Sequence, residues 1–220
     1  MWTNEITQMI LGGIRDTVYM TLVSTIAGYI FGLPLGIILT ITDKEGITPN
    51  AVIYKVLDVF INILRSVPFL ILMILLIPFT RFVVGQSYGS SATIVPLVVA
   101  ATPFIARMIE SSLKEVDHGV IEAAQSMGAS NFYIVWHVLL LEARTSILVG
   151  ATIATATILG YSAMAGAIGG GGLGDIAIRY GYYRYQTNIM LVTVILLVVL
   201  VQIFQTIGML FSKKLDHRNR

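Results

Sequence analysis

The sequence predicts an all-α integral membrane protein, and three observations support this fold class. Hydrophobic residues make up 56% of the 220 residues and charged residues only 12%, whereas about 25% of the residues in a soluble domain are charged. The apolar residues stand in runs long enough to cross a bilayer as helices. Transmembrane strands would instead appear as ~10-residue segments of alternating polarity. We therefore expect residues 1–220 to form a single transmembrane domain of five helices.

The first expected span, residues 17–42, contains no charged residue. Gly28, Gly32 and Gly36 follow one another at intervals of four, a small-xxx-small pattern that lets helices approach closely. We favour packing within the monomer over a subunit interface for these glycines. Residues 1–16 have mixed polarity and are expected to form a separate amphipathic helix on the membrane surface. The first apolar run is too long for a cleavable signal peptide, so we expect the span to be retained.

The second expected span, residues 56–80, carries Asp58, Asn62 and Arg65 in its first half. Charged residues at this depth usually face protein or the membrane boundary. We expect Asp58 to lie near the head groups. Arg65 either faces protein or a water-filled cavity, where it could have a functional role, or it snorkels to the membrane surface.

The third expected span, residues 92–109, contains Pro96 and Pro103. Each proline removes a helical hydrogen bond, so we expect this helix to be kinked or partly unwound. Broken helices in transporters often line the translocation path. Arg107 is expected to begin an exposed segment.

The fourth and fifth expected spans are residues 145–168, rich in alanine, threonine and glycine, and residues 187–212. The glycines at 169, 171 and 174 have the spacing of a dinucleotide-binding fingerprint. We reject that interpretation because no strand precedes them and no acidic residue follows at the required distance of about 20 residues. A flexible or tightly turned loop outside the membrane, continuing through Arg179, Arg184 and Tyr185, is the better explanation.

The longest polar interruption, residues 110–144, is predicted to form a helix–turn–helix outside the bilayer. Glu110 and Lys114 have the i,i+4 spacing of a helical ion pair. The sequence Glu122-Ala123-Ala124 follows in a short helix whose small residues would let another surface approach. Gly128 suits the left-handed position that terminates helices.

Ser130 can cap the second helix of this segment. Ile134, Val135, Val138 and Leu139 then fall close to one helical face. A solvated loop is the alternative, but it would need neither an apolar stripe of helical period nor a glycine placed to end a helix. We therefore interpret the segment as a docking device between membrane spans.

The distribution of basic residues predicts the orientation of the chain. Five spans put the two ends on opposite sides of the membrane, and cytoplasmic loops are enriched in lysine and arginine. With the C-terminus in the cytoplasm, ten of the 14 basic residues lie inside, which are Lys44, Lys55, Arg65, Arg107, Lys114, Arg144, Lys213, Lys214, Arg218 and Arg220. Four lie outside, which are Arg15, Arg81, Arg179 and Arg184. This orientation places the docking segment in the cytoplasm and the N-terminus outside.

Several classes of chemistry lack the residues they need. The chain has no cysteine, which excludes a disulfide, a thiolate metal site and a cysteine nucleophile. It has no Gly-Lys-Ser/Thr phosphate-binding loop, so an ATPase that drives it must be another chain. The three histidines lack metal-ligand spacing. We expect no catalytic residue, metal site or cofactor on this chain, and no nucleic acid among its partners.

Met164 is the candidate gate residue, with Tyr161 and Ser162 beside it. A long, polarizable thioether among alanines and glycines has room to project into a lumen and seal it. Packing in the helix core is the alternative for a methionine in a membrane span.

The docking segment resembles the coupling segment of ABC-importer permeases. The resemblance consists of Glu-Ala-Ala at 122–124, then Gly128 after three intervening residues, and, after nine more residues, an aliphatic residue and a leucine within Val138-Leu139-Leu140. Further blocks resemble the permease subunits of bacterial methionine importers: Arg65-Ser66-Val67-Pro68-Phe69, Pro78-Phe79-Thr80-Arg81, Pro103-Phe104-Ile105-Ala106-Arg107-Met108 and Gly160-Tyr161-Ser162-Ala163-Met164. Leu141 departs from the pattern, because the family usually has a proline there. Without it, Glu142 and Arg144 are expected to mark the turn into the next span.

The resemblance implies a type I ABC importer permease in the bacterial inner membrane. It implies a homodimer with the pore between subunits, two ATPase subunits docked on the cytoplasmic coupling helices, and an external binding protein that delivers the amino acid. In such families the positions of Glu122 and Gly128 engage a groove in the ATPase. Two alternatives remain: an autonomous secondary amino-acid transporter or channel, and a membrane scaffold or insertase component.

Overall fold

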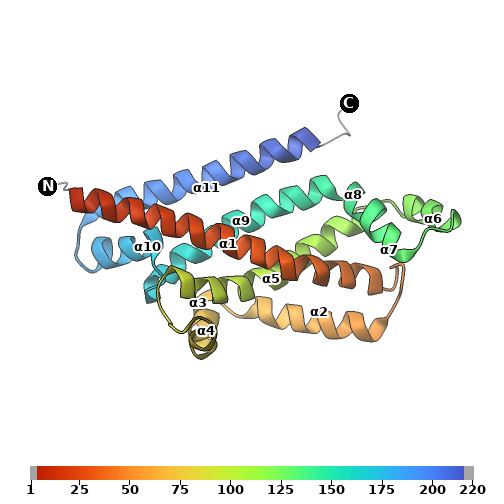
Figure 1. Ribbon diagram of the computed structural model, residues 1–220, viewed down its shortest axis with the longest axis horizontal. Coiled ribbons are helices and arrows are strands. Elements are labelled where there is room, and N and C mark those ends of the chain that lie inside the picture. The colour runs from red at the N-terminus through yellow and green to blue at the C-terminus, as the bar shows by residue number, and fades with distance from the viewer. Residues whose placement is uncertain (1–3, 216–220) are drawn as a thin grey trace.

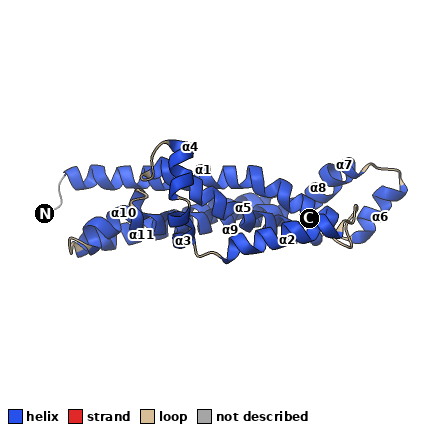
Figure 2. Cartoon of the chain, turned by 90° about the horizontal axis from the view of Figure 1, so that it is seen from below, coloured by secondary structure: helices blue, strands red, loops and turns tan. Residues whose placement is uncertain are grey.

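A computed structural model describes residues 4–215, and every regular element in that range is helical (Figures 1 and 2). The elements are α1 (Asn4–Thr42), α2 (Ala51–Ser66), α3 (Phe69–Leu75), α4 (Ile77–Val84), α5 (Ser90–Lys114), α6 (His118–Ser126), α7 (Asn131–Tyr133), the π-helical η1 (Ile134–Leu139), α8 (Leu140–Glu142), α9 (Arg144–Ala165), the 3₁₀ turn η2 (Gly166–Ile168), α10 (Gly172–Ile176), the π-helical η3 (Ala177–Tyr182) and α11 (Thr187–Leu215). The long helices lie alongside one another, and α6 and α7 project beyond them at one end.

Four helical segments of the described chain are long and apolar enough to cross a membrane. They are Asn4–Thr42, Ser90–Lys114, Arg144–Tyr182 and Thr187–Lys214. The pair formed by α2 and α3 passes the same test, although it is bent by 100°. Counted as one broken span, this pair gives the five membrane crossings that the sequence predicts.

The second span is therefore not the single helix expected over residues 56–80. Val67 has extended backbone angles, with φ −79° and ψ 123°, and separates α2 from α3. Its conformation follows from Pro68, whose ring disfavours the helical region for the preceding residue. A second break at Leu76 separates α3 from α4.

The interface between α1 and α5 forms the centre of the fold. A Cβ atom at Gly28 would lie 2.8 Å from Ile105, and one at Gly36 would lie 2.7 Å from the carbonyl oxygen of Ala106. Gly32 makes an equally close approach to Ile105. The three glycines thus pack within the monomer, as favoured from the sequence.

The expectations of a separate helix before the first span and of unwinding in the third span are wrong, whereas a kink at the two prolines stays a prediction. Helix α1 runs without a break from residue 4 through the first span, so residues 4–16 do not form a separate helix. Helix α5 is continuous through Pro96 and Pro103 and extends to Lys114. Both prolines are buried, and packing against α1 holds the helix together where the proline nitrogens cannot donate hydrogen bonds.

The glycine-rich segment after α9 is a tight turn, but the residues that follow it are helical rather than a loop. Gly169, Gly171 and Gly172 all have φ between +75° and +81°, a region that side chains disfavour. The chain turns back so that α10 packs against both α1 and α9. There the backbone N–H of Leu173 donates a 2.9 Å hydrogen bond to the buried hydroxyl of Thr17.

Candidate coupling and gate sites

Helix α6 carries the predicted coupling residues at the far end of the molecule (Figure 1). Asp117 caps its first turn, where the carboxylate accepts a 2.7 Å hydrogen bond from the Gly119 backbone N–H. Gly128, two residues after the last residue of the helix, has φ +79°. The predicted short helix with a left-handed glycine stop is therefore confirmed.

The coupling residues divide between the surface and the core. Glu122, Ala123 and Gly128 are exposed, whereas Ala124 is only 5% exposed and packs into the main hydrophobic cluster. In this chain, Glu122 and Ala123 are thus available to a partner. Ala124 instead fixes how closely α6 lies on the helices beneath it.

The second helix of the docking segment also begins where the sequence predicts. The Ser130 hydroxyl accepts a 3.3 Å hydrogen bond from the Tyr133 backbone N–H. Ile134, Val135 and Leu139 are buried, and their stripe attaches the segment to the core. At the position of the family proline, Leu141 is half exposed, and the helix breaks at Ala143, between Glu142 and Arg144.

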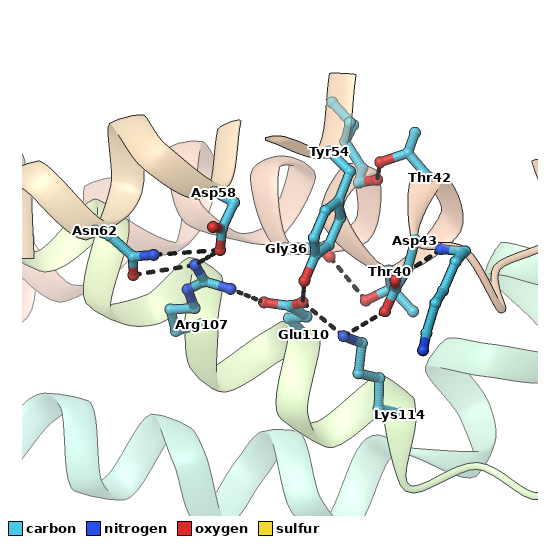
Figure 3. Close-up of polar contacts among 12 residues, drawn as sticks. Gly36, Thr40, Thr42, Asp43, Tyr54, Asp58, Asn62, Arg107, Glu110 and Lys114 are labelled. Atoms are coloured by element: carbon cyan, nitrogen blue, oxygen red, sulfur yellow. Dashed lines mark hydrogen bonds and ion pairs between the residues drawn. The ribbon is translucent and has the colours of Figure 1, made fainter. Parts of the chain in front are cut away.

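The start of the expected exposed segment is, in contrast, the most polar part of the interior. Glu110 is 4% exposed and lies on α5 between Arg107 and Lys114 (Figure 3). Its two carboxylate oxygens accept hydrogen bonds of 2.6 Å from Arg107 and 2.8 Å from Lys114. The Tyr54 hydroxyl on α2 donates a third, at 3.3 Å. The expectation that exposure begins at Arg107 is therefore wrong, because Glu110 is buried. The three hydrogen bonds make this burial possible, since an unpaired carboxylate in apolar surroundings would be costly.

This charge network, formed by Asp43, Asp58, Arg107, Glu110 and Lys114, joins three parts of the chain. Arg107 pairs with Asp58 on α2 as well as with Glu110. Lys114 lies 2.6 Å from a carboxylate oxygen of Asp43, just after α1. The hydrogen bond from the Lys114 ammonium lowers the pKa of Asp43 below its usual value. The network therefore ties α1, α2 and α5 together at the end of the molecule that carries α6.

Sequence reasoning identified the Glu110–Lys114 pair but missed the other members of this network. A signal for them is present. Asp58 and Asn62 are four residues apart in α2, and Arg107, Glu110 and Lys114 follow at intervals of three and four in α5. Each of these two helices carries a polar stripe at helical spacing within an apolar sequence. The polar side chains find partners most simply if the two stripes face each other.

The three candidate gate residues have different positions on α9. Met164 is 51% exposed and shares its face with the exposed Ile153 and Gly160. Tyr161 is half buried and stacks on Phe69 of α3, with ring centroids 4.7 Å apart.

Ser162, in contrast, is 1% exposed, and its hydroxyl donates a 2.7 Å hydrogen bond to the Leu159 carbonyl oxygen. Of the three side chains, Met164 alone projects substantially from the monomer. Met164 is thus exposed on a helix that Tyr161 packs against α3, while Ser162 is buried and bonded within α9 itself.

Comparison with known proteins agrees with this arrangement. The profile of the family described as "Binding-protein-dependent transport system inner membrane component" matches residues 32–220. A Vibrio cholerae protein named as a probable D-methionine transport system permease protein, MetI, is 49% identical over 217 residues, covering 99% of this chain and 96% of that relative. The Escherichia coli K12 D-methionine transport system permease protein MetI is 47% identical over 158 residues, covering 72% of this chain and 73% of that protein.

A solved structure is similar over almost the entire chain. It is a native crystal form in a study of inward-facing conformations of the MetNI methionine ABC transporter. The matching chain has 43% sequence identity and a TM-score of 0.97, and the match covers 98% of this chain and 100% of that one. With its bent second span and protruding α6, the chain has the fold of a type I ABC importer permease, and it belongs to the family of binding-protein-dependent transport system inner membrane components.

Proposed function

We propose that this chain is the permease subunit of an ABC importer that carries methionine across the bacterial inner membrane. It works as a homodimer, with two ATPase subunits docked on its α6 helices and an external binding protein that delivers the amino acid. The observation that carries the proposal is α6 itself, an exposed helix that ends in a left-handed glycine and projects beyond the membrane helices. The substrate is proposed from relatives named for D-methionine transport.

In the proposed orientation α6 lies in the cytoplasm, where ATP is available. Helix α1 begins at the opposite end of the molecule from α6 (Figure 1). The excess of lysine and arginine on the α6 side supports this orientation. Of the basic residues counted for it, Arg218 and Arg220 lie outside the described residues.

Movement of the ATPase would pass from α6 to α5 through packed side chains. Ala124, Ile134 and Leu139 belong to the same hydrophobic cluster as Leu113 and Val116 at the end of α5. Closely packed interiors transmit displacement because they have little free volume. The charge network then connects α5 to α1 and α2, so the inner ends of three spans move as one body.

The second subunit would pack against the exposed face of α9 that contains Ile153, Gly160 and Met164. Gly160 has no heavy atom within 4 Å of its would-be Cβ, which leaves room for a close neighbour. Two Met164 side chains would then meet across the pore and close it, with Tyr161 stacked on Phe69 of α3 and Ser162 buried within α9 behind them. Alternating access requires only that ATP bind the two conformations with different affinity.

The test is ATP-driven uptake of radiolabelled methionine into proteoliposomes with the binding protein outside. We expect uptake only when the ATPase subunit and ATP are both present. Like glycine, aspartate tolerates the left-handed backbone conformation of position 128. Gly128→Asp therefore leaves the turn possible but adds bulk and charge to the docking surface. It should abolish association with the ATPase and uptake while leaving membrane insertion intact. Uptake by the permease alone would instead support an autonomous carrier, and absence of uptake with every subunit present would support a scaffold.

A further inference from the structure

Three adjoining hollows that share lining residues form a groove along the membrane-spanning part of the chain, and Arg65 lines the two that lie farther from α6. One hollow of about 240 Å³ lies at the break between α2 and α3 and is lined by Arg65, Phe69, Phe104 and Tyr161, among others. A second, of about 340 Å³, is also lined by Arg65 and Phe104 and extends between α5 and α9 to Ser112. The two hollows thus meet at one cation and one aromatic ring.

The groove continues toward the end of the molecule that carries α6. A third hollow, of about 260 Å³, shares Ser112, Glu115, Ser146 and Val149 with the second. It extends to Glu142, where the docking segment joins α9. The groove therefore leads from the helix break toward the proposed cytoplasmic face.

Arg65 differs from the other cation of the groove in having no partner. Arg107 is held by Asp58 and Glu110, whereas Arg65 forms no ion pair or hydrogen bond with any side chain between residues 4 and 215. It is exposed, and it lies 14 residues past the start of α2, about 21 Å along the helix axis. Because the α2–α3 pair passes the test for one broken span, Arg65, the residue before the last of α2, lies beside the bend of that span.

We propose that Arg65 binds the carboxylate of the transported amino acid at a transient site within the membrane. Charged residues inside the membrane normally face a partner or a water-filled cavity, and Arg65 faces the cavity. Its planar guanidinium can hold a carboxylate through two hydrogen bonds. Phe104, which lines both hollows, supplies an apolar surface for the side chain of the same ligand.

The ligand class is therefore an α-amino acid with an apolar side chain. Drug-sized ligands fill sites of about 300–1,000 Å³. An amino acid is smaller than such ligands, so hollows of about 240 and 340 Å³ have room for it. Ile153 lines the second hollow and also lies on the face of α9 that is proposed to meet the second subunit, where the pore lies between the subunits. The site therefore adjoins the proposed translocation path. This inference rests on the proposed function and adds a substrate contact to it.

The test is equilibrium binding of radiolabelled methionine to the purified permease–ATPase complex without the binding protein. Arg65→Gln should weaken binding by about ten- to hundredfold, the usual value of a hydrogen-bonded charge pair. Arg65→Lys keeps the charge but loses the two-point contact, so its affinity should fall between those of wild type and Arg65→Gln. Arg81→Gln is the matched control, since Arg81 is an exposed cation on α4 that lines none of the three hollows.

A second measurement separates ligand binding from a structural role of Arg65 in the last turn of α2. Methioninol, the amino alcohol that lacks the carboxylate, should compete at least tenfold more weakly than methionine for the wild-type complex. The two compounds should compete equally for Arg65→Gln. A merely structural role would lower the yield of assembled complex and leave this discrimination unchanged.

Two results would overturn the proposal: no saturable binding to a wild-type complex that transports, or equal binding by wild type and Arg65→Gln. Either leaves the proposed function intact, because ATP-driven uptake is measured on the same preparation. Failure of the permease to assemble with any ATPase would remove both proposals together.

Discussion

Replacing Glu110 by glutamine should destabilise the protein, because this change removes the central charge of the network while keeping its shape. The carboxylate accepts hydrogen bonds of 2.6 Å from Arg107 and 2.8 Å from Lys114. Hydrogen bonds to charged groups contribute about 1.5–3 kcal/mol each, so losing both would cost at most about 3–6 kcal/mol, although the glutamine carbonyl oxygen can still accept one neutral hydrogen bond. Two features reduce this figure. Lys114 is 41% exposed and partly screened by solvent, and each cation keeps a second partner, Asp58 or Asp43.

We therefore expect Glu110→Gln to lower the free energy of unfolding by about 2–4 kcal/mol. For a chain of this length the corresponding fall in Tm is roughly 5–15 °C, measured on the purified protein in detergent. Glu142→Gln is the control, because Glu142 is exposed and forms no ion pair with a described residue, and it should stay within about 0.5 kcal/mol of wild type. Equal Tm values for Glu110→Gln and wild type would mean that the network contributes nothing to stability.

Three further changes test other parts of the structure. Gly36→Ala should destabilise the fold by about 1–3 kcal/mol in thermal unfolding, because its Cβ would lie 2.6 Å from Ile109. Gly12→Ala, with nothing within 4 Å, should be neutral or slightly stabilising, and the reverse order would contradict the α1–α5 packing. Asp43 has a lowered pKa in the folded state, so its stabilising contribution is complete above the ordinary aspartate value and disappears as pH falls through the folded pKa. Asp43→Asn should therefore flatten the acid limb of a Tm-versus-pH curve, and an unchanged limb would contradict the pairing with Lys114. Met164→Ala should make the resting pore leaky to a small solute in proteoliposomes, and unchanged leak would remove Met164 as the gate.

Local signals predicted much of the fold correctly. Gly28, Gly32 and Gly36 indicated close helix packing, and Gly128 and Ser130 marked the end of one helix and the start of the next. Each of these predictions depends on the backbone geometry or size of one residue, which is a property of the sequence itself. The break at Pro68 was not predicted, although the proline that causes it is visible in the sequence, and nothing local indicated that α3 would turn by 100°.

The failures concern features that depend on contacts between distant segments. Pro103 looked like a point of unwinding, but α1 packs against α5 and keeps the helix intact. Glu110 looked exposed because its neighbours in sequence are polar, and only the approach of α2 and the end of α1 shows that it is buried. The sequence does not reveal the helix that begins at Gly172, because the stability of this helix comes from packing on α1 and α9 rather than from an apolar pattern of its own.

The most direct test of the central claim is the sidedness of α6. The chain has no cysteine, so Glu122→Cys and, as a control in the loop between α4 and α5, Gln86→Cys each introduce a single reactive thiol. A membrane-impermeant maleimide should label position 122 only in inside-out vesicles and position 86 only in right-side-out vesicles. Added ATPase subunit should protect position 122. Labelling of position 122 from the outside, or no protection by the ATPase, would contradict the account of how energy enters this protein.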